Sequence, residues 1–326
     1  MNTKNILILT VILALLGAGL WYKKNASPPQ NLMTAESLHR FAPEDLDLES
    51  ITGVDVTGPD NATVRLDKTE AGWVVASLDN APANAASIDH LLETVANLRG
   101  EQRANDEAVL PDFQLDAAGA VRLTLRQGQR DVLRLLLGKG DFRTVFVRED
   151  GANAVHVVPG TLLTQIGLKG RAPSPQFWID TNLLSIAAPD VRELRLTMPG
   201  AEAVLTRAAQ PGPNATNATN ATATPAWAFR QTKGKGLTQA QLEDIVPALA
   251  RVSAAEALPV NDPRRTGLEQ PTHALTVQTA SKTMTLRAAR PSPDADAVVR
   301  LDDAAHAYTM RGIVFERLFP NAAPKK

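Results

Sequence analysis

Gly72-Trp73-Val74-Val75 and Ala226-Trp227-Ala228-Phe229 are the stretches that decide the fold, because the same set of elements surrounds each of them. Each tryptophan strand follows short strand-like runs and precedes one amphipathic helix, a turn and a final set of strands. This order runs from about Ile51 to Ile166 and again from about Val191 to Leu318. A repeat of this length predicts two similar domains in tandem.

Apolar positions match between the two copies, with a constant offset from the strand at Leu123 onward. The match allows each candidate site in one copy to be compared with its counterpart in the other. The matched positions are Leu91, Val95 and Leu98 with Leu242, Val246 and Leu249; Leu123 and Leu125 with Leu275 and Val277; and Gly160, Leu163 and Ile166 with Gly312, Phe315 and Leu318.

The composition is that of a globular protein without a nucleic-acid partner. The chain has 326 residues, enough for two domains of ordinary size, and 44% of them are hydrophobic. The net charge of −1, with both signs scattered, lacks the concentrated basic surface that phosphate binding needs. The absence of cysteine excludes disulfides, thiolate metal sites and cysteine nucleophiles.

An apolar run from Ile6 to Tyr22, followed by Lys23 and Lys24, predicts a single transmembrane helix at the N-terminus. Such a helix spans roughly 25 Å at about 1.5 Å per residue, and the flanking lysines can bridge the remaining thickness. The competing interpretation is a cleaved signal peptide, and both place residues 25–326 outside the cytoplasm. Residues expected to hold the anchor include Ile6, Leu16, Trp21 and Tyr22.

The pattern predicts a strand-rich α+β fold, with one main helix on a mostly antiparallel sheet in each copy. In copy one, strands are expected at 51–56, 63–66, 72–76, 121–125, 131–137, 144–148 and 154–158, and helices from Ser87, as N-cap, to a stop at Gly100 and over 161–166. In copy two, strands are expected at 191–198, 203–207, 227–231, 274–278, 283–288, 298–301 and 307–310, with a helix over 238–250 that contains Pro247.

These elements divide the chain into a membrane anchor, a spacer, two modules and a linker. We expect the Phe177-Trp178 pair of the linker to pack between the domains and to form an interaction surface. The insertion reads Asn-Ala-Thr three times, from Asn214, Asn217 and Asn220; we interpret it as a low-complexity loop, although the triplets match the glycosylation sequon. The predicted segments are anchor 1–24, spacer 25–48, module one 49–169, linker 170–189, module two 190–320 with insertion 211–225, and tail 321–326.

Several short motifs, in this order and spacing, resemble a bacterial family known as domain of unknown function 4340. They are Gly72-Trp73, the helix-ending Leu98 and Leu249, Gly267-Leu268-Glu269-Gln270-Pro271, Leu136-Leu137-Gly138, Val145-Phe146-Val147-Arg148 and Phe177-Trp178-Ile179-Asp180. Copy one departs from the Gly-Leu-x-x-Pro turn, because it reads Gln114-Leu115-Asp116-Ala117-Ala118.

The resemblance implies a membrane-anchored protein of the bacterial inner membrane, single-pass, with the bulk of the chain periplasmic. Members of the family are often encoded beside ABC transporters of the gliding-motility type. The resemblance therefore implies an extracytoplasmic protein partner in a membrane complex of the ABC permease type, and it implies no catalytic residues.

The five histidines do not form a metal-binding pattern, since none lie in an H-x-x-x-H or H-E-x-x-H arrangement. His156 lies opposite Tyr308 in the alignment of the copies, which favours a packing position on a strand over a metal ligand. His90 is expected to be exposed on its helix. No metal and no cofactor is therefore predicted.

Motifs for nucleophilic catalysis and phosphate binding are also missing. No G-x-S-x-G elbow is present, and Ser87 is better explained as a helix cap. Lys139 in Gly138-Lys139-Gly140 and the Lys233-Gly234-Lys235-Gly236 run both fall short of a Walker loop. Carboxylates such as Glu44-Asp45 and Asp302-Asp303 are taken as solvated surface.

The function that follows is a membrane-anchored, extracytoplasmic, non-enzymatic binding or accessory protein, associated with an ABC-type transport complex. Two alternatives stay open. One is an envelope hydrolase with a site between the two repeats, and the other is a structural spacer.

Overall fold

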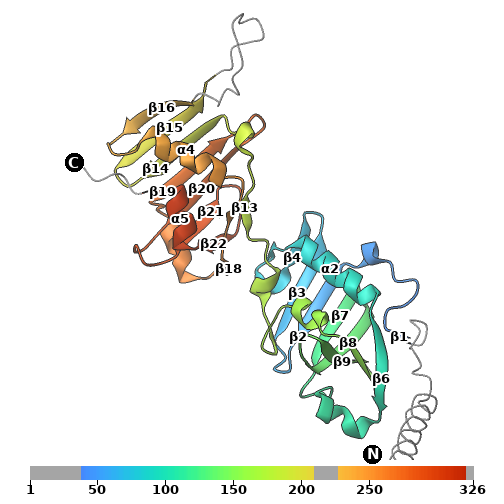
Figure 1. Ribbon diagram of the computed structural model, residues 1–326. Helices are drawn as coiled ribbons and strands as arrows, with labels where there is room; N and C mark the ends of the chain where they lie inside the picture. The colour runs from blue at the N-terminus through green and yellow to red at the C-terminus, as the bar shows by residue number, and fades with distance from the viewer. Residues whose placement is uncertain (1–37, 209–226, 321–326) are drawn as a thin grey trace, which may run out of the picture.

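Two antiparallel sheets, each with helices packed on one face, make up the structure (Figure 1). The computed structural model describes residues 38–208 and 227–320. Strand pairing is antiparallel throughout the two large sheets of this described part. The predicted α+β class, mostly antiparallel and with few helices, is therefore confirmed.

The first sheet has the strand order β1-β6-β10-β9-β8-β7-β2-β3-β4-β5. The strands are β1 (His39–Arg40), β2 (Gly53–Thr57), β3 (Thr63–Thr69), β4 (Gly72–Val75), β5 (Ala81–Pro82), β6 (Arg99–Asn105), β7 (Val121–Gln127), β8 (Arg130–Gly140), β9 (Thr144–Glu149) and β10 (Ala154–Pro159). The helices of this half are α2 (Ala85–Ala96), α3 (Thr161–Gln165) and the 3-10 helices η2 (Leu48–Ser50), η3 (Ala76–Leu78) and η4 (Glu107–Phe113).

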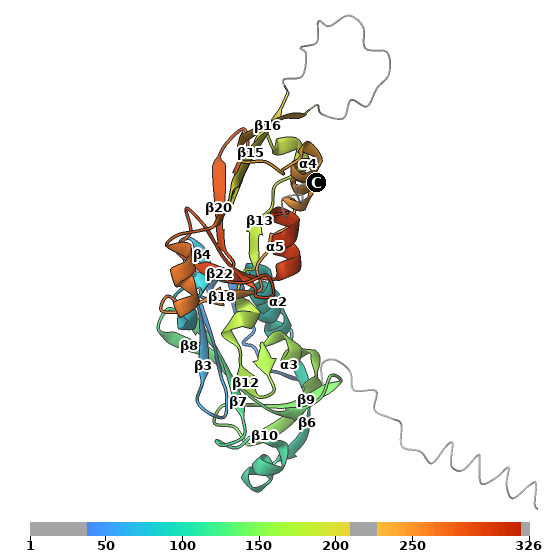
Figure 2. The same ribbon diagram turned by 90° about the vertical axis from the view of Figure 1, so that its left-hand side faces the viewer.

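The second sheet has the order β16-β15-β14-β19-β20-β21-β22-β18. Its strands are β14 (Glu193–Met198), β15 (Ala201–Arg207), β16 (Trp227–Lys233), β18 (Glu256–Leu258), β19 (His273–Gln278), β20 (Thr283–Ala289), β21 (Ala297–Leu301) and β22 (Ala307–Met310). Figure 2 shows α4 (Gln239–Ala248) and α5 (Gly312–Leu318) together on one side of this sheet, and the 3-10 helix η7 (Pro263–Leu268) precedes β19.

A connecting segment joins the two halves. Its elements are β11 (Leu168–Lys169), β12 (Ala172–Pro173), η5 (Pro175–Trp178), β13 (Asn182–Leu184) and η6 (Ala188–Asp190). One short pair, β11 with β12, lies within it, its strand β13 pairs with the distant strand β17 (Val252–Ser253), and a single bridge links Ala83 to Ile179.

Helix α2 forms because its sequence supplies both a cap and an apolar face. The Asn84 side chain accepts a hydrogen bond from the Ser87 backbone N–H at 3.2 Å, so Asn84, and not Ser87 as expected, is the N-cap. Four side chains of the helix at spacings of three and four residues are buried against the sheet, each stabilising the fold by about 1.5–3 kcal/mol. They are Ile88, Leu91, Leu92 and Val95.

The end of α2 also differs from the prediction. The helix ends at Ala96 with Asn97 as C-cap, and Gly100 lies on β6 instead of stopping the helix. A side chain at Gly100 would collide with those of His156 and Val158, so the glycine permits close packing between strands. In the second half, where a helix over 238–250 was expected, Thr238 and Gln241 form a capping box at the start of α4, and the helix ends at Ala248.

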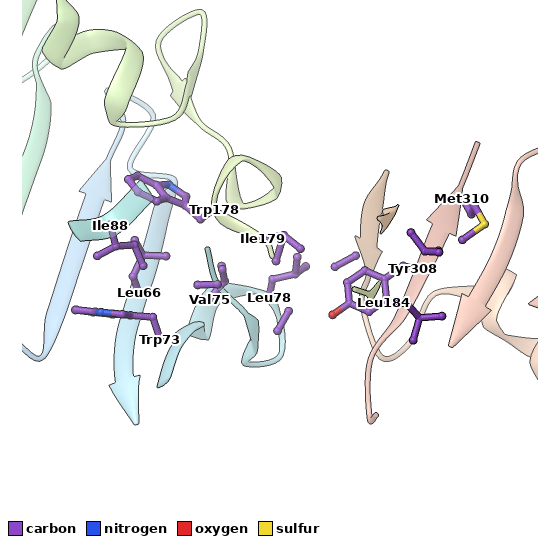
Figure 3. Packing of buried hydrophobic residues seen from close by; sticks show 14 of the residues in the cluster. Leu66, Trp73, Val75, Leu78, Ile88, Trp178, Ile179, Leu184, Tyr308 and Met310 are labelled. Carbon is purple, nitrogen blue, oxygen red and sulfur yellow. The ribbon is translucent and has the colours of Figure 1, made fainter. Parts of the chain in front are cut away.

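One hydrophobic core runs through both halves. Figure 3 shows Trp178 beside Ile88 in the first half, while Leu78, Ile179, Leu184, Tyr308 and Met310 carry the packing toward the second sheet. Phe41, from the predicted spacer, is also buried in this core next to β1. The first module thus includes residues that the sequence pattern assigned to the spacer.

Within residues 38–208 and 227–320, no helix is long and apolar enough to cross a membrane. The predicted anchor, with Ile6, Leu16, Trp21 and Tyr22, lies outside the described residues, as do the 211–225 insertion and the 321–326 tail.

Candidate functional site

A cavity of about 750 Å³ opens in the second half, between η7 and the strands β20, β21 and β22. Its floor is apolar, with Ala289 and Val298 exposed by 9% and 5%. Its rim is polar and carries charges of both signs. The lining residues are Ala255, Glu256, Arg264, Thr266, Gly267, Gln270, Thr272, Ala289, Arg290, Pro291, Ala295, Asp296, Val298, Thr309 and Arg311.

Of the three arginines that line the cavity, Arg264 and Arg290 have side chains that are hydrogen-bonded within the protein. Arg264 donates from Nε and Nη2 to the two carboxylate oxygens of Asp262, at 2.9 and 2.7 Å. These bonds lower the pKa of Asp262 to about 2 and raise the pKa of Arg264. Asp262 also caps η7 by accepting from the Arg264 backbone N–H, so the pair fixes the start of that helix.

Arg290 fastens the loop that follows β20. Its Nε donates to the Ala295 carbonyl at 2.8 Å, its Nη2 donates to the Pro293 carbonyl, and its Nη1 pairs with Glu316 at 3.0 Å. The guanidinium carbon lies 5.2 Å from the ring centroid of Phe315, a cation–π distance. Arg290 therefore shapes one wall of the cavity.

Arg311 is the arginine left available to a ligand. It is exposed, and its guanidinium has no hydrogen-bond or ion-pair partner among residues 38–208 and 227–320. Asp296, on the same rim, also lacks such partners in this part of the chain, and Glu256 interacts electrostatically with Arg264. The free rim thus offers donors and acceptors together, an arrangement suited to dipolar groups such as peptide bonds.

The junction between the halves is a second place where function could reside, but its polar groups are paired. The Gln176 amide donates to the Ala257 carbonyl at 2.8 Å and accepts from the Ala257 N–H at 2.9 Å, so it covers part of the free edge of β18. Asp79, with a positive φ of 54°, accepts from the Val260 N–H at 2.7 Å, and its carbonyl lies 2.9 Å from His306 Nε2. These bonds join residues far apart in sequence and fill the junction.

Phe177 and Trp178, the predicted interaction surface, have different environments. Trp178 is fully buried, with its ring 5.0 Å from that of Phe177, and its carbonyl accepts from the Asn84 N–H at 2.7 Å. Its side chain is therefore not accessible to a partner. Phe177 is 45% exposed and packs on Gly167, so of the two only Phe177 can take part in a surface contact.

His156 lies in a packed aromatic cluster, as the comparison of the copies predicts. It is 4% exposed and stacks on His39 with ring centroids 4.4 Å apart, while Phe41 meets it edge-on at 5.3 Å. Burial lowers the pKa of His156, His39 lowers it further, and Glu149 opposes the shift. Tyr308, its counterpart, is 5% exposed, and burial raises its pKa.

The remaining predicted candidates are dispersed. His90 is exposed, as expected, and it contacts Gln165. Lys139 lies over the Phe113 ring at 5.3 Å and not in a phosphate loop. Asp302 pairs with Arg287. Within the described ranges, no group of three or more histidine, aspartate or glutamate side chains could hold a metal ion.

The fold defines a class of two-lobed, antiparallel α+β proteins with few helices. Comparison with known proteins places the chain within it: a family model described as a domain of unknown function, DUF4340, matches residues 73–271. The chain therefore belongs to this family, as the resemblance indicated. No curated protein and no solved structure shows significant similarity to the chain.

Sequence reasoning missed the cavity and the residues that line it. Of its lining, only Gly267 and Gln270 belong to a motif singled out beforehand, the Gly267–Pro271 turn. No local pattern in the sequence marks the other lining residues, because they come from η7, β18, β20, β21, β22 and the loops between them.

Proposed function

We propose that the protein is a non-enzymatic binding or accessory protein of the cell envelope. An N-terminal helix holds it to the inner membrane, and its two lobes stand outside the cytoplasm and bind an ABC-type transport complex. The family assignment, joined to the apolar run from Ile6 to Tyr22, is the observation that carries the proposal.

The two lobes are, in this proposal, copies of one module. Eight neighbouring strands of the first sheet, in the order β4-β3-β2-β7-β8-β9-β10-β6, match the order β16-β15-β14-β19-β20-β21-β22-β18 of the second sheet strand for strand. Along the chain, α2 follows β4 (after η3 and β5) and α4 follows β16. A second helix follows the last strand of each meander, α3 after β10 and α5 after β22. Tandem modules with a shared core give a firm two-lobed body suited to holding a partner at a distance from the membrane.

Binding is favoured over hydrolysis by the contents of the cavity. Its arginines Arg264 and Arg290 are occupied by structural partners, and no nucleophile–base pair is present among the groups that line it. A spacer role without binding is disfavoured because a purely structural lobe has no need of an open cavity of about 750 Å³.

Membrane fractionation tests the anchor and the location. The full chain is expected in the membrane fraction after a carbonate wash, and deletion of residues 6–22 is expected to release it. Protease added to spheroplasts should digest the lobes. A deletion variant that stays bound to membranes, or lobes protected in spheroplasts, would contradict this part of the proposal.

Co-purification tests the partner. The full chain, extracted from its own membranes in mild detergent, is expected to bring down permease and ATPase subunits of one complex. If the purified chain brought down no permease or ATPase subunit and hydrolysed an envelope component, the result would contradict the accessory role and favour the hydrolase alternative.

A further inference from the structure

The cavity in the second lobe occupies the place that two phenylalanine rings fill in the first lobe. Phe113 and Phe146 pack with ring centroids 4.7 Å apart and join a small cluster with Leu110, Leu115 and Leu136. This cluster lies on the face of the first sheet opposite to α2, beneath η4. The matching cluster in the second lobe contains only Leu258, Leu268, Ala289, Val298 and Ala307.

Strand pairing identifies Val298 as the counterpart of Phe146. Val147 pairs with His156 and Leu137, and Val299 pairs with Tyr308 and Ala288 in the same way. Phe146 directly precedes Val147, and Val298 directly precedes Val299, so Phe146 and Val298 correspond. Val298 lines the cavity, so a large side chain in one lobe is replaced by a small one where the cavity opens.

The second phenylalanine is replaced as well. Phe113 is two residues before the buried Leu115, at the end of η4, and Thr266 is two residues before the buried Leu268, in η7. Thr266 also lines the cavity. Both aromatic rings of the first lobe are thus absent from the second, at the two positions that face its cavity.

A glycine lies where the 3-10 helix meets the sheet in both lobes. In the first lobe, Gly138 lets η4 lie directly on β8, since a Cβ there would collide with the Phe113 carbonyl. The matching residue of β20 is Ala289, whose Cβ lies 3.0 Å from where a Cβ on Gly267 would be. At this contact the glycine is thus on the strand in the first lobe and on η7 in the second.

A basic residue follows Gly138 in the first lobe and Ala289 in the second. Lys139, directly after Gly138, lies over the Phe113 ring at 5.3 Å. Arg290, directly after Ala289, lines the cavity. The Arg290 guanidinium is already held by Glu316, two backbone carbonyls and the Phe315 ring, so it is the apolar floor of Ala289 and Val298 that favours an aromatic ring in the cavity.

We propose that this cavity receives an aromatic side chain from an extended peptide segment of the protein partner. The ring takes the place that Phe113 and Phe146 hold in the first lobe, and the mixed rim of Arg311, Glu256 and Asp296 binds the peptide backbone around it. The proposal rests on the proposed binding function and names the surface and the chemistry that it uses.

The absence of cysteine from the chain allows a direct test, because one introduced thiol is the only one present. Val298→Cys places it in the cavity floor, and Val204→Cys is a matched control. The two valines have the same exposure of 5%, and Val204 does not line the cavity. Each full-length variant is treated in its membranes with benzyl methanethiosulfonate, and thermal melting confirms that both are folded.

The thiol at position 298 is expected to react at least about tenfold faster than the thiol at 204, because the cavity admits the ring. N-acetyl-phenylalaninamide is expected to slow the reaction at 298 several-fold, and N-acetyl-alaninamide is not. Adding Thr266→Phe restores one ring of the first lobe and should remove both the fast reaction and the protection.

Equal reaction rates at 298 and 204, or equal protection by the two amides, would overturn the proposal. This labelling needs no partner, so its failure is distinct from failure of the membrane complex to co-purify. If co-purification succeeds and labelling fails, the partner binds elsewhere on the chain.

Discussion

Substitution of Trp178 tests whether the connecting segment belongs to the core of the first lobe. The side chain is fully buried, and its Nε1 has no hydrogen-bond partner among the described residues. An aromatic side chain buries about 150–250 Å², which at about 25 cal/mol per Å² corresponds to about 4–6 kcal/mol. Measured costs of large-to-alanine substitutions at buried aromatic positions are about 3–5 kcal/mol.

The unpartnered Nε1 lowers the expected cost, because its removal recovers the penalty of a buried donor. We therefore expect Trp178→Ala to lower the free energy of unfolding by about 3–4 kcal/mol. Trp178→Phe keeps most of the apolar area and removes the orphan donor, so its expected cost is below about 1.5 kcal/mol.

Guanidinium unfolding of the full chain, followed by circular dichroism, measures both variants. Phe177→Ala is the neighbouring control, since Phe177 is 45% exposed, and its expected cost is below about 1 kcal/mol. Equal losses for Trp178→Ala and Phe177→Ala would refute the assignment of the connecting segment to the core.

Three further substitutions test other parts of the structure. Asp79→Ala removes the acceptor for the Val260 N–H and places alanine at positive φ. We expect the free energy of unfolding to fall by about 1–2 kcal/mol in chemical denaturation, and by less for Asp79→Asn. Equal losses for the two variants would contradict the role of the backbone conformation. Arg126→Leu leaves Asp55, whose side chain is 13% exposed, with one partner fewer and should cost about 1–2 kcal/mol, less at high salt; a salt-independent loss would argue against the ion pair. The pKa of His156 is lowered in the folded state, so its stabilising effect is complete above the unfolded pKa of about 6.5 and declines as the pH falls toward the folded value. His156→Tyr, which copies Tyr308, is expected to flatten the decline of melting temperature between pH 7 and 5, and an unchanged slope would contradict this.

The strands and helices of both lobes were largely predictable because their signals are local. Alternating residues such as Leu123 and Leu125 lie on one face of β7, and both are buried as expected. The helix faces of α2 and α4 follow from spacings of three and four residues in the same way. Boundaries were less certain where capping residues compete: Asn84 and Ser87 both suit an N-cap, and only the folded chain distinguishes them.

Features that depend on distant contacts could not be predicted. Strand β6 has a polar sequence, Arg99–Asn105, and forms because β10 offers it a pairing edge. Phe41 is buried only because β1 pairs with β6, which no local pattern reveals. That the Phe177-Trp178 pair packs was expected from the sequence, but the sequence did not reveal that Trp178 alone would be fully buried and Phe177 exposed.

The cavity could not be predicted for the same reason, because neither Thr266 nor Val298 belongs to a sequence pattern that indicates a binding site. The proposed correspondence of the two lobes, which matches them with Phe113 and Phe146, gives them their role in the proposal. The rim groups Glu256, Asp296 and Arg311 come from separate elements and meet only in the folded chain.

The most direct test of the account is quantitative co-purification of the tagged full-length protein from its own membranes, with mass spectrometry of what accompanies it. The account predicts permease and ATPase subunits of one ABC-type complex in amounts comparable to the tagged chain. It also predicts their loss when Thr266→Phe and Val298→Phe fill the cavity while the protein stays folded in the membrane. Recovery of the tagged chain without any membrane partner in comparable amount would contradict the central claim.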